Sequence, residues 1–263
     1  MNGKINLSKV PEITAYFWIV KILTTAMGES SSDYLVFHMN PVIAVALGFL
    51  GFVVALVLQF SVRKYIAWVY WLTVVMVALF GTMAADVLHV EFGIPYVVST
   101  IFFAIALTVI FILWYASEKT LDIHSINTPR RELFYWATVL ATFALGTAAG
   151  DMTAIAFGWG FLSSGIIFTI LIAAVAASHY IAKAILGAEH RHLSRNAVFA
   201  FWFAYVLTRP LGASFADWMG KANNAGGLGW GDGPVALGLG ILIFGLISYL
   251  AITRKDIQRH TPV

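Results

Sequence analysis

One pattern occurs four times along this 263-residue chain, with the same internal spacing in every copy. An aromatic residue precedes a tryptophan, a glycine follows the tryptophan by ten residues, and an aspartate follows it by fifteen. The copies are Phe17-Trp18/Gly28/Asp33, Tyr70-Trp71/Gly81/Asp86, Tyr135-Trp136/Gly146/Asp151 and Phe201-Trp202/Gly212/Asp217. Such regularity indicates that the chain arose by duplication of one unit, so that unit constrains the fold and holds its chemistry.

The chain contains more apolar surface than a soluble domain of its length can bury. Hydrophobic residues make up 60% of it, charged residues 11%, and the mean hydropathy is +0.84. Apolar stretches long enough to cross a bilayer lie near 12–34, 41–62, 65–88, 96–116, 132–156, 161–185, 196–219 and 234–253. The sequence therefore predicts an all-α integral membrane protein with eight transmembrane helices. It forms one domain over 1–263, with repeats at about 11–63, 64–120, 129–186 and 195–253.

Thirteen of the sixteen Lys and Arg residues lie in alternate connections between these segments. Only Lys221 lies in the opposite connections. The basic residues of the first set are Lys4, Lys9, Arg63, Lys64, Lys119, Arg130, Arg131, Lys183, Arg191, Arg195, Arg254, Lys255 and Arg259. By the positive-inside rule, both termini are cytoplasmic. The net charge of +3 thus reports membrane orientation, and we expect a lipid bilayer rather than nucleic acid as the partner.

Each repeat begins and ends on the same side, so the four two-helix units are parallel. Parallel repeats are normally related by axes along the membrane normal, which predicts pseudo-symmetry with the four motif helices around a common centre. At about 100° per residue, the Trp, the positions seven and eleven residues later (+7 and +11) and the Asp at +15 share one helix face. This stripe spans about 22 Å.

The four motif aspartates are the strongest candidates for chemistry. An ionised carboxylate near hydrocarbon usually pairs, faces water or serves a function. At +11 the stripe is polar in three copies, which predicts a hydrated path that continues inward from the aspartates. The predicted cation-binding residues are Asp33, Asp86, Asp151, Asp217, Glu29, Thr82 and Thr147. The alternative is that the aspartates only mark polar helix ends.

The glycines and tryptophans of the motif favour packing to different degrees. A small residue follows each glycine by four, a pattern that lets membrane helices approach closely. The tryptophans either fill space between helices or line a cavity. The residues concerned are Trp18, Trp71, Trp136 and Trp202.

Two intramembrane cations break the four-fold pattern. Lys21 at +3 and Arg209 at +7 lie near the bilayer centre, where cations are candidates for function. They are either a gate or switch, an anion site, or structural ion pairs, of Arg209 with a motif Asp or of Lys21 with Glu29. Pro210 predicts a local break in its helix.

Metal and enzyme chemistry are constrained by what the chain lacks. Asp86 and His89 lie three residues apart on one helix face and suit a divalent metal. The alternative is that His89 is an interfacial histidine that binds water. The chain has no cysteine, which excludes disulfides and thiolate sites. It shows no HExxH and no nucleophile elbow. We expect neither an enzyme nor a cofactor other than a bound or transported metal ion.

Several segments resemble a known family. These are KVPEITAYFW, TAMGESSSD, ALFGTMAAD, ALGTAAGD and RPLGASFAD. The chain, from Pro11 to about Thr253, resembles bacterial inner-membrane proteins built from a "repeat of unknown function". The resemblance implies the eight-helix layout and the bacterial cytoplasmic membrane, and it implies no established activity.

These observations favour a membrane transporter or channel for a cation, either a divalent metal ion or one coupled to protons, with an outward-facing carboxylate site. Two alternatives stay open. One is a carrier of anions or small organic acids that uses Lys21 and Arg209, and the other is a scaffold or sensor that transports nothing. The substrate is a small ion or molecule, and a homo-oligomer is left open.

Overall fold

The computed structural model describes residues 8–186 and 191–257, and these residues form eight α-helices and no strand. The helices are α1 (Ala15–His38), α2 (Pro41–Ser61), α3 (Ala67–Val90), α4 (Tyr96–Glu118), α5 (Pro129–Asp151), α6 (Phe161–Leu186), α7 (Arg191–Gly220) and α8 (Asp232–Thr253). Three short elements join them, the 3-10 turns η1 (Ile123–Ser125) and η3 (Asn223–Ala225) and the π-helical η2 (Met152–Ala156). All eight expected helices are present, with ends within about five residues of the expected ones.

Local sequence explains where two of the helices begin. The Asn40 side chain accepts a hydrogen bond from the backbone N–H of Val42 at 3.0 Å, and Pro41 occupies the first turn of α2. Thr128 caps α5 in the same way, with Pro129 next to it. A polar cap followed by proline satisfies the free N–H groups of a first turn and fixes the entry of the chain.

Seven of the described helices, α2 to α8, are long and apolar enough to cross a membrane. The exception is α1, which contains Lys21, Glu29 and Asp33. Large apolar side chains cover the outer helices, such as Val42 on α2, which is 76% exposed. Contiguous exposed apolar surface of this extent is typical of a lipid-facing wall, and the helices together indicate a multi-pass membrane protein.

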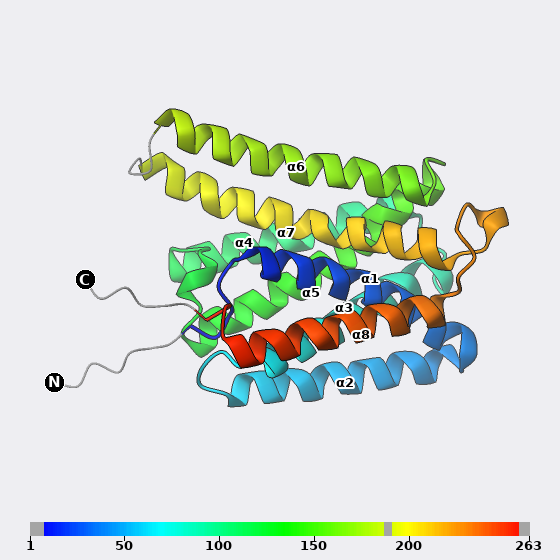
Figure 1. Ribbon diagram of the computed structural model, residues 1–263. Helices are drawn as coiled ribbons and strands as arrows, with labels where there is room; N and C mark the ends of the chain where they lie inside the picture. Colours follow the sequence, from blue (N-terminus) through cyan, green and yellow to red (C-terminus); the bar gives the residue numbers. More distant parts are fainter. Residues whose placement is uncertain (1–7, 187–190, 258–263) are drawn as a thin grey trace.

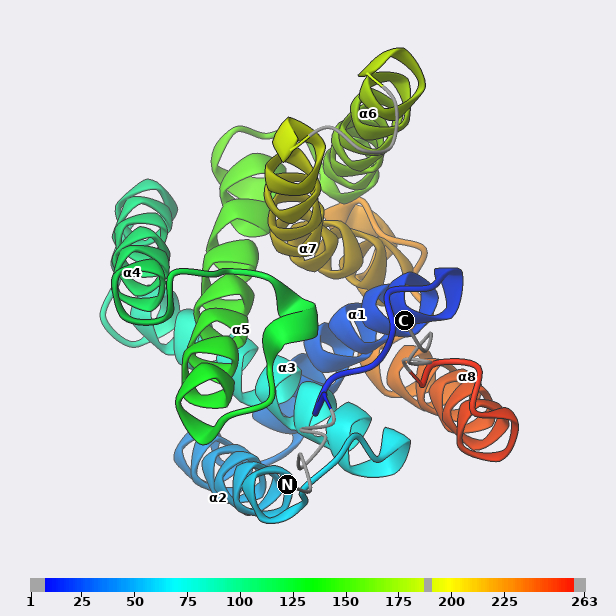
Figure 2. The same ribbon diagram turned by 90° about the vertical axis from the view of Figure 1, so that its left-hand side faces the viewer.

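The first helix of every repeat lies inside and the second lies outside. In Figure 1 the helices lie side by side along one long direction, and the end-on view of Figure 2 places α1, α3, α5 and α7 around the centre. Contacts run from α1 to α3, α3 to α5, α5 to α7 and α7 back to α1. The inner helices therefore form a closed, parallel four-helix ring, as the repeat pattern predicted.

Each outer helix packs mainly on the inner helix of the next repeat rather than on its own. Thus α2 packs on α3, α4 on α5 and α6 on α7, and α8 closes the circle by packing on α1. The packing unit is therefore shifted by one helix from the sequence repeat. No repeat buries its apolar face alone.

The motif glycines lie where neighbouring inner helices meet. A Cβ atom on Gly28 would stand 2.6 Å from the Cβ of Ala78, and one on Gly81 would stand 2.8 Å from that of Phe143. The same relation joins Gly146 to Arg209, and Gly212 to Thr25. In every case the glycine faces the +7 residue of the next copy, so its missing side chain sets the spacing of the ring.

An aromatic layer closes the ring towards the end that carries both termini. The aromatic residue of each copy packs against the tryptophan of the next, with ring centroids 5.6–6.2 Å apart. The four contacts are Phe17–Trp71, Tyr70–Trp136, Tyr135–Trp202 and Phe201–Trp18. Trp71, Trp136 and Trp202 are buried, while Trp18 is partly exposed. The four indoles thus belong to a packed layer, and the cavity-lining role stays a prediction.

The helix that contains Pro210 does not break there, so that expectation is wrong. α7 continues from Arg191 to Gly220, and the Thr25 hydroxyl lies 3.1 Å from the Thr208 carbonyl, to which it donates. The same hydroxyl lies 2.6 Å from the Ile22 carbonyl of its own helix, so its one proton is shared between the two carbonyls.

The two ends of the described chain meet. The backbone N–H of Glu12 donates to the carbonyl of Asp256 at 2.8 Å, so the segments before α1 and after α8 lie at the same end. The predicted inner residues Lys4 and Arg259 lie outside the described residues, as do the side chains of Lys183, Arg191 and Arg195. The side of the membrane that this end faces stays a prediction.

Candidate functional site: a polar axis below an acid ring

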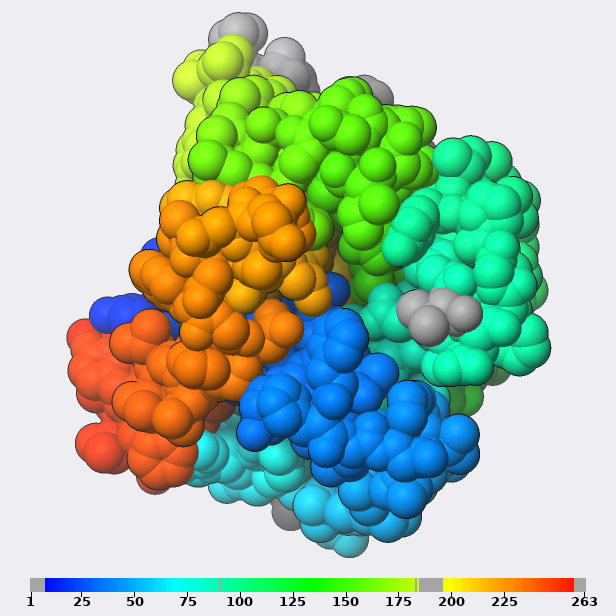
Figure 3. Space-filling model, turned by 90° about the vertical axis from the view of Figure 1, so that its right-hand side faces the viewer, coloured from blue at the N-terminus to red at the C-terminus, as the bar shows by residue number. Residues whose placement is uncertain are grey.

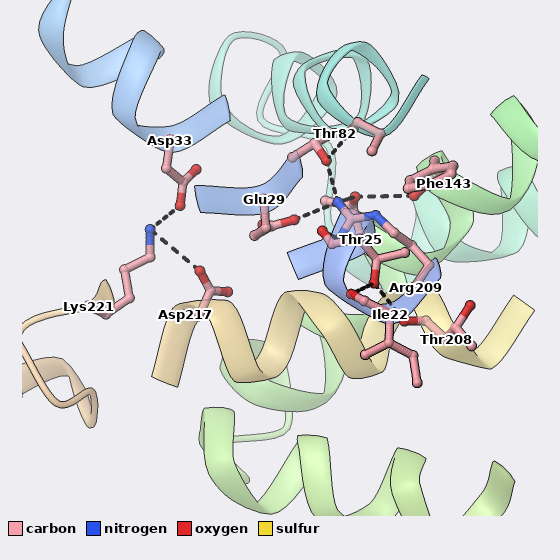
Figure 4. A network of polar contacts seen from close by, with 12 residues as sticks. Ile22, Thr25, Glu29, Asp33, Thr82, Phe143, Thr208, Arg209, Asp217 and Lys221 are labelled. Atoms are coloured by element: carbon pink, nitrogen blue, oxygen red, sulfur yellow. Dashed lines mark hydrogen bonds and ion pairs between the residues drawn. The ribbon is translucent and has the colours of Figure 1, made fainter. Parts of the chain in front are cut away.

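Arg209 lies in the centre of the inner ring and is fully buried. Its Nη2 atom is 2.5 Å from Glu29 Oε2 and 2.7 Å from Thr147 Oγ1, and it also contacts Thr82 Oγ1 (Figure 4). The +11 residues of three copies therefore converge on a guanidinium from the fourth. That copy has Ala213 at +11, which leaves room for this arrangement.

The two threonines are held as acceptors towards Arg209. Thr82 Oγ1 donates its proton to the Ala78 carbonyl and Thr147 Oγ1 donates to the Phe143 carbonyl, each one turn earlier in its own helix. A hydroxyl has one proton to give, so the oxygen lone pairs face the guanidinium. The predicted role of Thr82 and Thr147 in an ion path stays a prediction, and in this structure they stabilise a buried cation.

Lys21 is the second buried cation and has a different environment. Its Nζ atom lies 4.0 Å from the ring centre of Phe143 and 4.3 Å from that of Tyr205. No hydrogen-bond partner for this atom is present among the described residues. The predicted pair of Lys21 with Glu29 is therefore not formed, because Glu29 pairs with Arg209 instead. An ammonium between two aromatic faces gains cation–π stabilisation but lacks an acidic counter-charge.

The motif aspartates form an acid ring at the other end of the inner helices, and its two halves differ. Asp33 and Asp217 belong to the paired half, where Lys221 contacts Asp33 and lies 3.6 Å from Asp217 (Figure 4). Lys221 also lies 3.9 Å from Asp232. Burial lowers the pKa of Lys221, but the three carboxylates outweigh burial and raise it above its ordinary value. The ammonium is therefore held charged by this half.

Asp86, Asp151 and His89 form the unpaired half of the ring. Each offers one ligand atom, and these atoms lie within 4.8 Å of one another. No cationic side chain of the described residues contacts either carboxylate within ion-pair distance. Two ionised carboxylates at this separation repel one another, so a bound cation or a shared proton stabilises them.

The orientation of His89 suits a metal ligand. The Ser99 hydroxyl donates to the Tyr96 carbonyl at 3.0 Å, so Ser99 Oγ accepts from His89 Nε2, which lies 2.6 Å away. The hydrogen-bond network thus assigns the proton of neutral His89 to Nε2. Nδ1 then carries a lone pair, is buried and has no partner among the described residues. Metal-binding histidines are typically held by such a contact on the second ring nitrogen.

Solvent reaches the acid ring from the end opposite the termini. Figure 3 shows this end hollowed near its centre, between the segments that join α1 to α2, α5 to α6 and α7 to α8. The Asp33 side chain is 16% exposed and Lys221 is 26% exposed. Asp86, His89 and Asp151 are also partly exposed. An ion in solution therefore has access to the ring, whereas Glu29 and Arg209 below it are closed off.

A second polar cluster seals the end that carries the termini. Lys9, which precedes α1, lies 2.5 Å from Glu132 on α5, and Gln59 donates to the same carboxylate at 2.9 Å. Nearby, the Tyr65 hydroxyl lies 2.5 Å from Asp256 and donates to it. Burial, followed by the Asp256 charge, raises the pKa of Tyr65, so it stays a neutral hydroxyl.

Sequence reasoning did not identify Lys221 and Asp232 as members of the acid ring. One signal was available, because Lys221 follows Asp217 by four residues on the same helix face. It also did not identify the cluster of Lys9, Gln59 and Glu132. These residues come from three distant segments, and no spacing along the chain joins them.

Apolar helices around a buried polar axis define a multi-pass membrane protein of internal repeats. The chain belongs to the family described as Repeat of Unknown Function (DUF347), whose profile matches it four times, at residues 16–65, 69–120, 134–184 and 200–256. These matches follow the four repeats. Comparisons with curated proteins and with solved structures gave no match.

Proposed function

We propose that the protein is a transporter for divalent metal ions in the bacterial cytoplasmic membrane, with the unpaired half of the acid ring as its outward-facing site. The observation that carries the proposal is the group of Asp86, His89 and Asp151, whose ligand atoms lie within 4.8 Å of one another. Among the described residues, no cationic side chain lies within ion-pair distance of these two carboxylates. Two carboxylates and an imidazole form a donor set suited to Mn²⁺, Fe²⁺ or Zn²⁺.

All eight helices cross the bilayer in this proposal, with both termini in the cytoplasm. The basic connections lie at the end that carries the termini, in agreement with the positive-inside rule. The polar residues of α1 do not oppose insertion, because Lys21 and Glu29 point into the ring and are buried there. A charged side chain within a membrane is tolerated when it faces a bundle interior and finds a partner.

The closed axis favours a carrier over an open channel. Below the acid ring, a metal ion meets Arg209, then Lys21, then the aromatic layer. Two fixed positive charges repel a cation in a medium of low dielectric constant. Passage therefore requires the inner helices to rearrange. Glu29 is placed to couple metal binding at the acid ring to this rearrangement. Its carboxylate pairs with Arg209, and its ligand atom also lies within 4.8 Å of those of Asp33 and Asp217.

Lys21 keeps the anion carrier as a second candidate, because its ammonium has no acidic counter-charge. Arg209 supports this alternative less, because Glu29 and two threonine oxygens already surround its guanidinium. Uptake of a small organic acid that is lost in Lys21→Met, with folding intact, would favour this candidate.

The test uses the purified full-length protein in liposomes that enclose a metal-sensitive dye. We expect Mn²⁺ or Zn²⁺ to enter wild-type vesicles, and entry to stop in the double variant Asp86→Asn with Asp151→Asn. Glu91→Gln is the matched control, since Glu91 is an exposed acid at the same end. Unchanged flux in the double variant would overturn the proposal. A wild type that moves neither metal nor anion would favour the scaffold or sensor.

A further inference from the structure

A line of tyrosine hydroxyls crosses the aromatic layer and is not explained by packing. The hydroxyls of Tyr70 and Tyr135 lie 2.5 Å apart, and both residues are fully buried. The equivalent residues in the first and fourth copies are Phe17 and Phe201, which make the same ring contacts without a hydroxyl. Phenylalanine therefore suffices for packing at this position, and burying a hydroxyl instead has a desolvation cost.

The line continues towards the centre of the membrane through Tyr205. Its ring and that of Tyr135 both pack against Trp202, and its buried hydroxyl completes no hydrogen bond among the described residues. The Lys21 ammonium lies 4.3 Å from the centre of the Tyr205 ring and also has no hydrogen-bond partner there. The line thus ends inside the protein at an unpartnered donor. The charged residue that acts on Lys21 here is Arg209, which belongs to α7, as Tyr205 does.

In the other direction the line reaches solvent. The rings of Tyr70 and Tyr65 are in edge contact, with centroids 5.6 Å apart, and Tyr65 donates to Asp256. Tyr65 and Asp256 line a surface pocket of about 400 Å³ together with Lys64 and Arg254. Asp256 Oδ1 is buried without a partner, so it has a free lone pair to accept a proton.

We propose that Tyr205, Tyr135, Tyr70 and Tyr65 form a proton path between Lys21 and the pocket at Asp256, on the side of the termini. A hydroxyl both donates and accepts, so Tyr70 and Tyr135 can exchange a proton directly across 2.5 Å. The other links are ring contacts in this structure, so a proton passes them when side-chain motion or a water molecule joins the polar atoms. The net step converts the Lys21 ammonium to an amine and the Asp256 carboxylate to a carboxylic acid, which releases its proton to water. Rotation of the hydroxyls then resets the line.

This path deepens the proposed transport function and rests on it, since it couples passage of the metal to the release of a proton on the side of the termini. When Lys21 loses its proton, one of the two positive charges that block the axis disappears. The barrier to a cation then falls because the charges act at low dielectric constant. The aromatic layer therefore excludes ions and water while it passes protons.

The test measures proton movement directly, with the full-length protein in liposomes that contain a pH-sensitive dye. The variants are Tyr70→Phe, Tyr135→Phe and Tyr205→Phe, which keep the ring and remove only the hydroxyl. We expect metal-driven proton flux to fall about tenfold in each, roughly the effect of one missing buried hydrogen bond on a rate. Tyr180→Phe is the matched control, because Tyr180 is 69% exposed on α6.

Two results would overturn the path. One is a wild type that moves Mn²⁺ without protons, which leaves the metal-transport proposal intact. The other is wild-type proton flux in the three phenylalanine variants. Unfolding temperatures of each variant, with Lys21→Gln as an additional variant at the inner end of the line, separate a blocked path from a misfolded protein. Mn²⁺ binding at the acid ring should be unchanged in the phenylalanine variants.

Discussion

The two halves of the acid ring contain the same repeat aspartates in different charge environments. On the α1–α7 side, Asp33 and Asp217 share the Lys221 ammonium, and Glu29 below them holds Arg209. On the α3–α5 side, Asp86 and Asp151 have His89 beside them and no cation among the described residues. Duplication supplied four equal carboxylates, and added charges in the first and fourth copies neutralised one half. This difference in charge is the reason for proposing the α3–α5 side, and not the α1–α7 side, as the cation site.

The largest effect is expected for Arg209→Met in the paired half. This change leaves the Glu29 charge buried without a partner, which should cost about 3–5 kcal/mol of stability. Glu29→Gln should be similarly costly because it strands the guanidinium. The double variant should recover much of the loss, since removing both charges avoids an unpaired one. Chemical unfolding in detergent measures all three, and additive losses in the double variant would contradict the pairing.

The next largest effect comes from giving the unpaired half a cation of its own. Ile155 follows Asp151 by four residues, as Lys221 follows Asp217, and it is 52% exposed. Ile155→Lys should therefore place an ammonium beside Asp151 and weaken Mn²⁺ binding about tenfold, or roughly 1.4 kcal/mol. Isothermal titration with Ile155→Met as the control checks this. Equal affinity in the two variants would mean that the metal does not bind at this half.

Removing the cation from the paired half should have the opposite effect on binding. In Lys221→Met, Asp33 and Asp217 lose their shared ammonium, so this half should bind a second metal ion. The loss of stability should be about 1 kcal/mol, because the lysine is partly exposed and solvent screens its pairs. A titration that still saturates at one ion per chain would show that the halves differ in more than charge.

The smallest effect is the pH dependence of the contribution that Lys221 makes to the free energy of unfolding. The pKa of Lys221 is raised in the folded protein, so its ion pairs stabilise fully below the unfolded pKa of about 10.4. This contribution is lost as the pH rises from the unfolded pKa through the higher pKa that Lys221 has in the folded protein. The difference in unfolding temperature between wild type and Lys221→Met should therefore stay constant from about pH 7 to 9 and shrink in stronger base. A difference that already shrinks between about pH 7 and 9 would assign the contribution to another group.

The apolar stretches were enough to predict the helices, and the repeats predicted that the four motif helices surround a common centre. Gly28 meeting Ala78 and Gly146 meeting Arg209 are instances of one contact that the spacing implies for all copies. The ion pair of Arg209 with Glu29 could not be predicted from the spacing alone, because it depends on the fourth inner helix lying next to the first. The same holds for His89 and Asp151, which meet only because α3 and α5 are neighbours. Spacing within one helix gives a face, but it does not give the order of helices around a ring.

The packing of α7 and α8 on α1 has a consequence for biosynthesis. Glu29 and Arg209 are 180 residues apart, so at about 5–20 residues per second the ribosome needs roughly 10–40 s to make the second after the first. During that interval α1, the described helix that is not apolar enough by composition to cross a membrane, is without its partner. We expect α1 to settle at full depth only after the fourth repeat emerges, which would make the last two helices the step that completes insertion of the first.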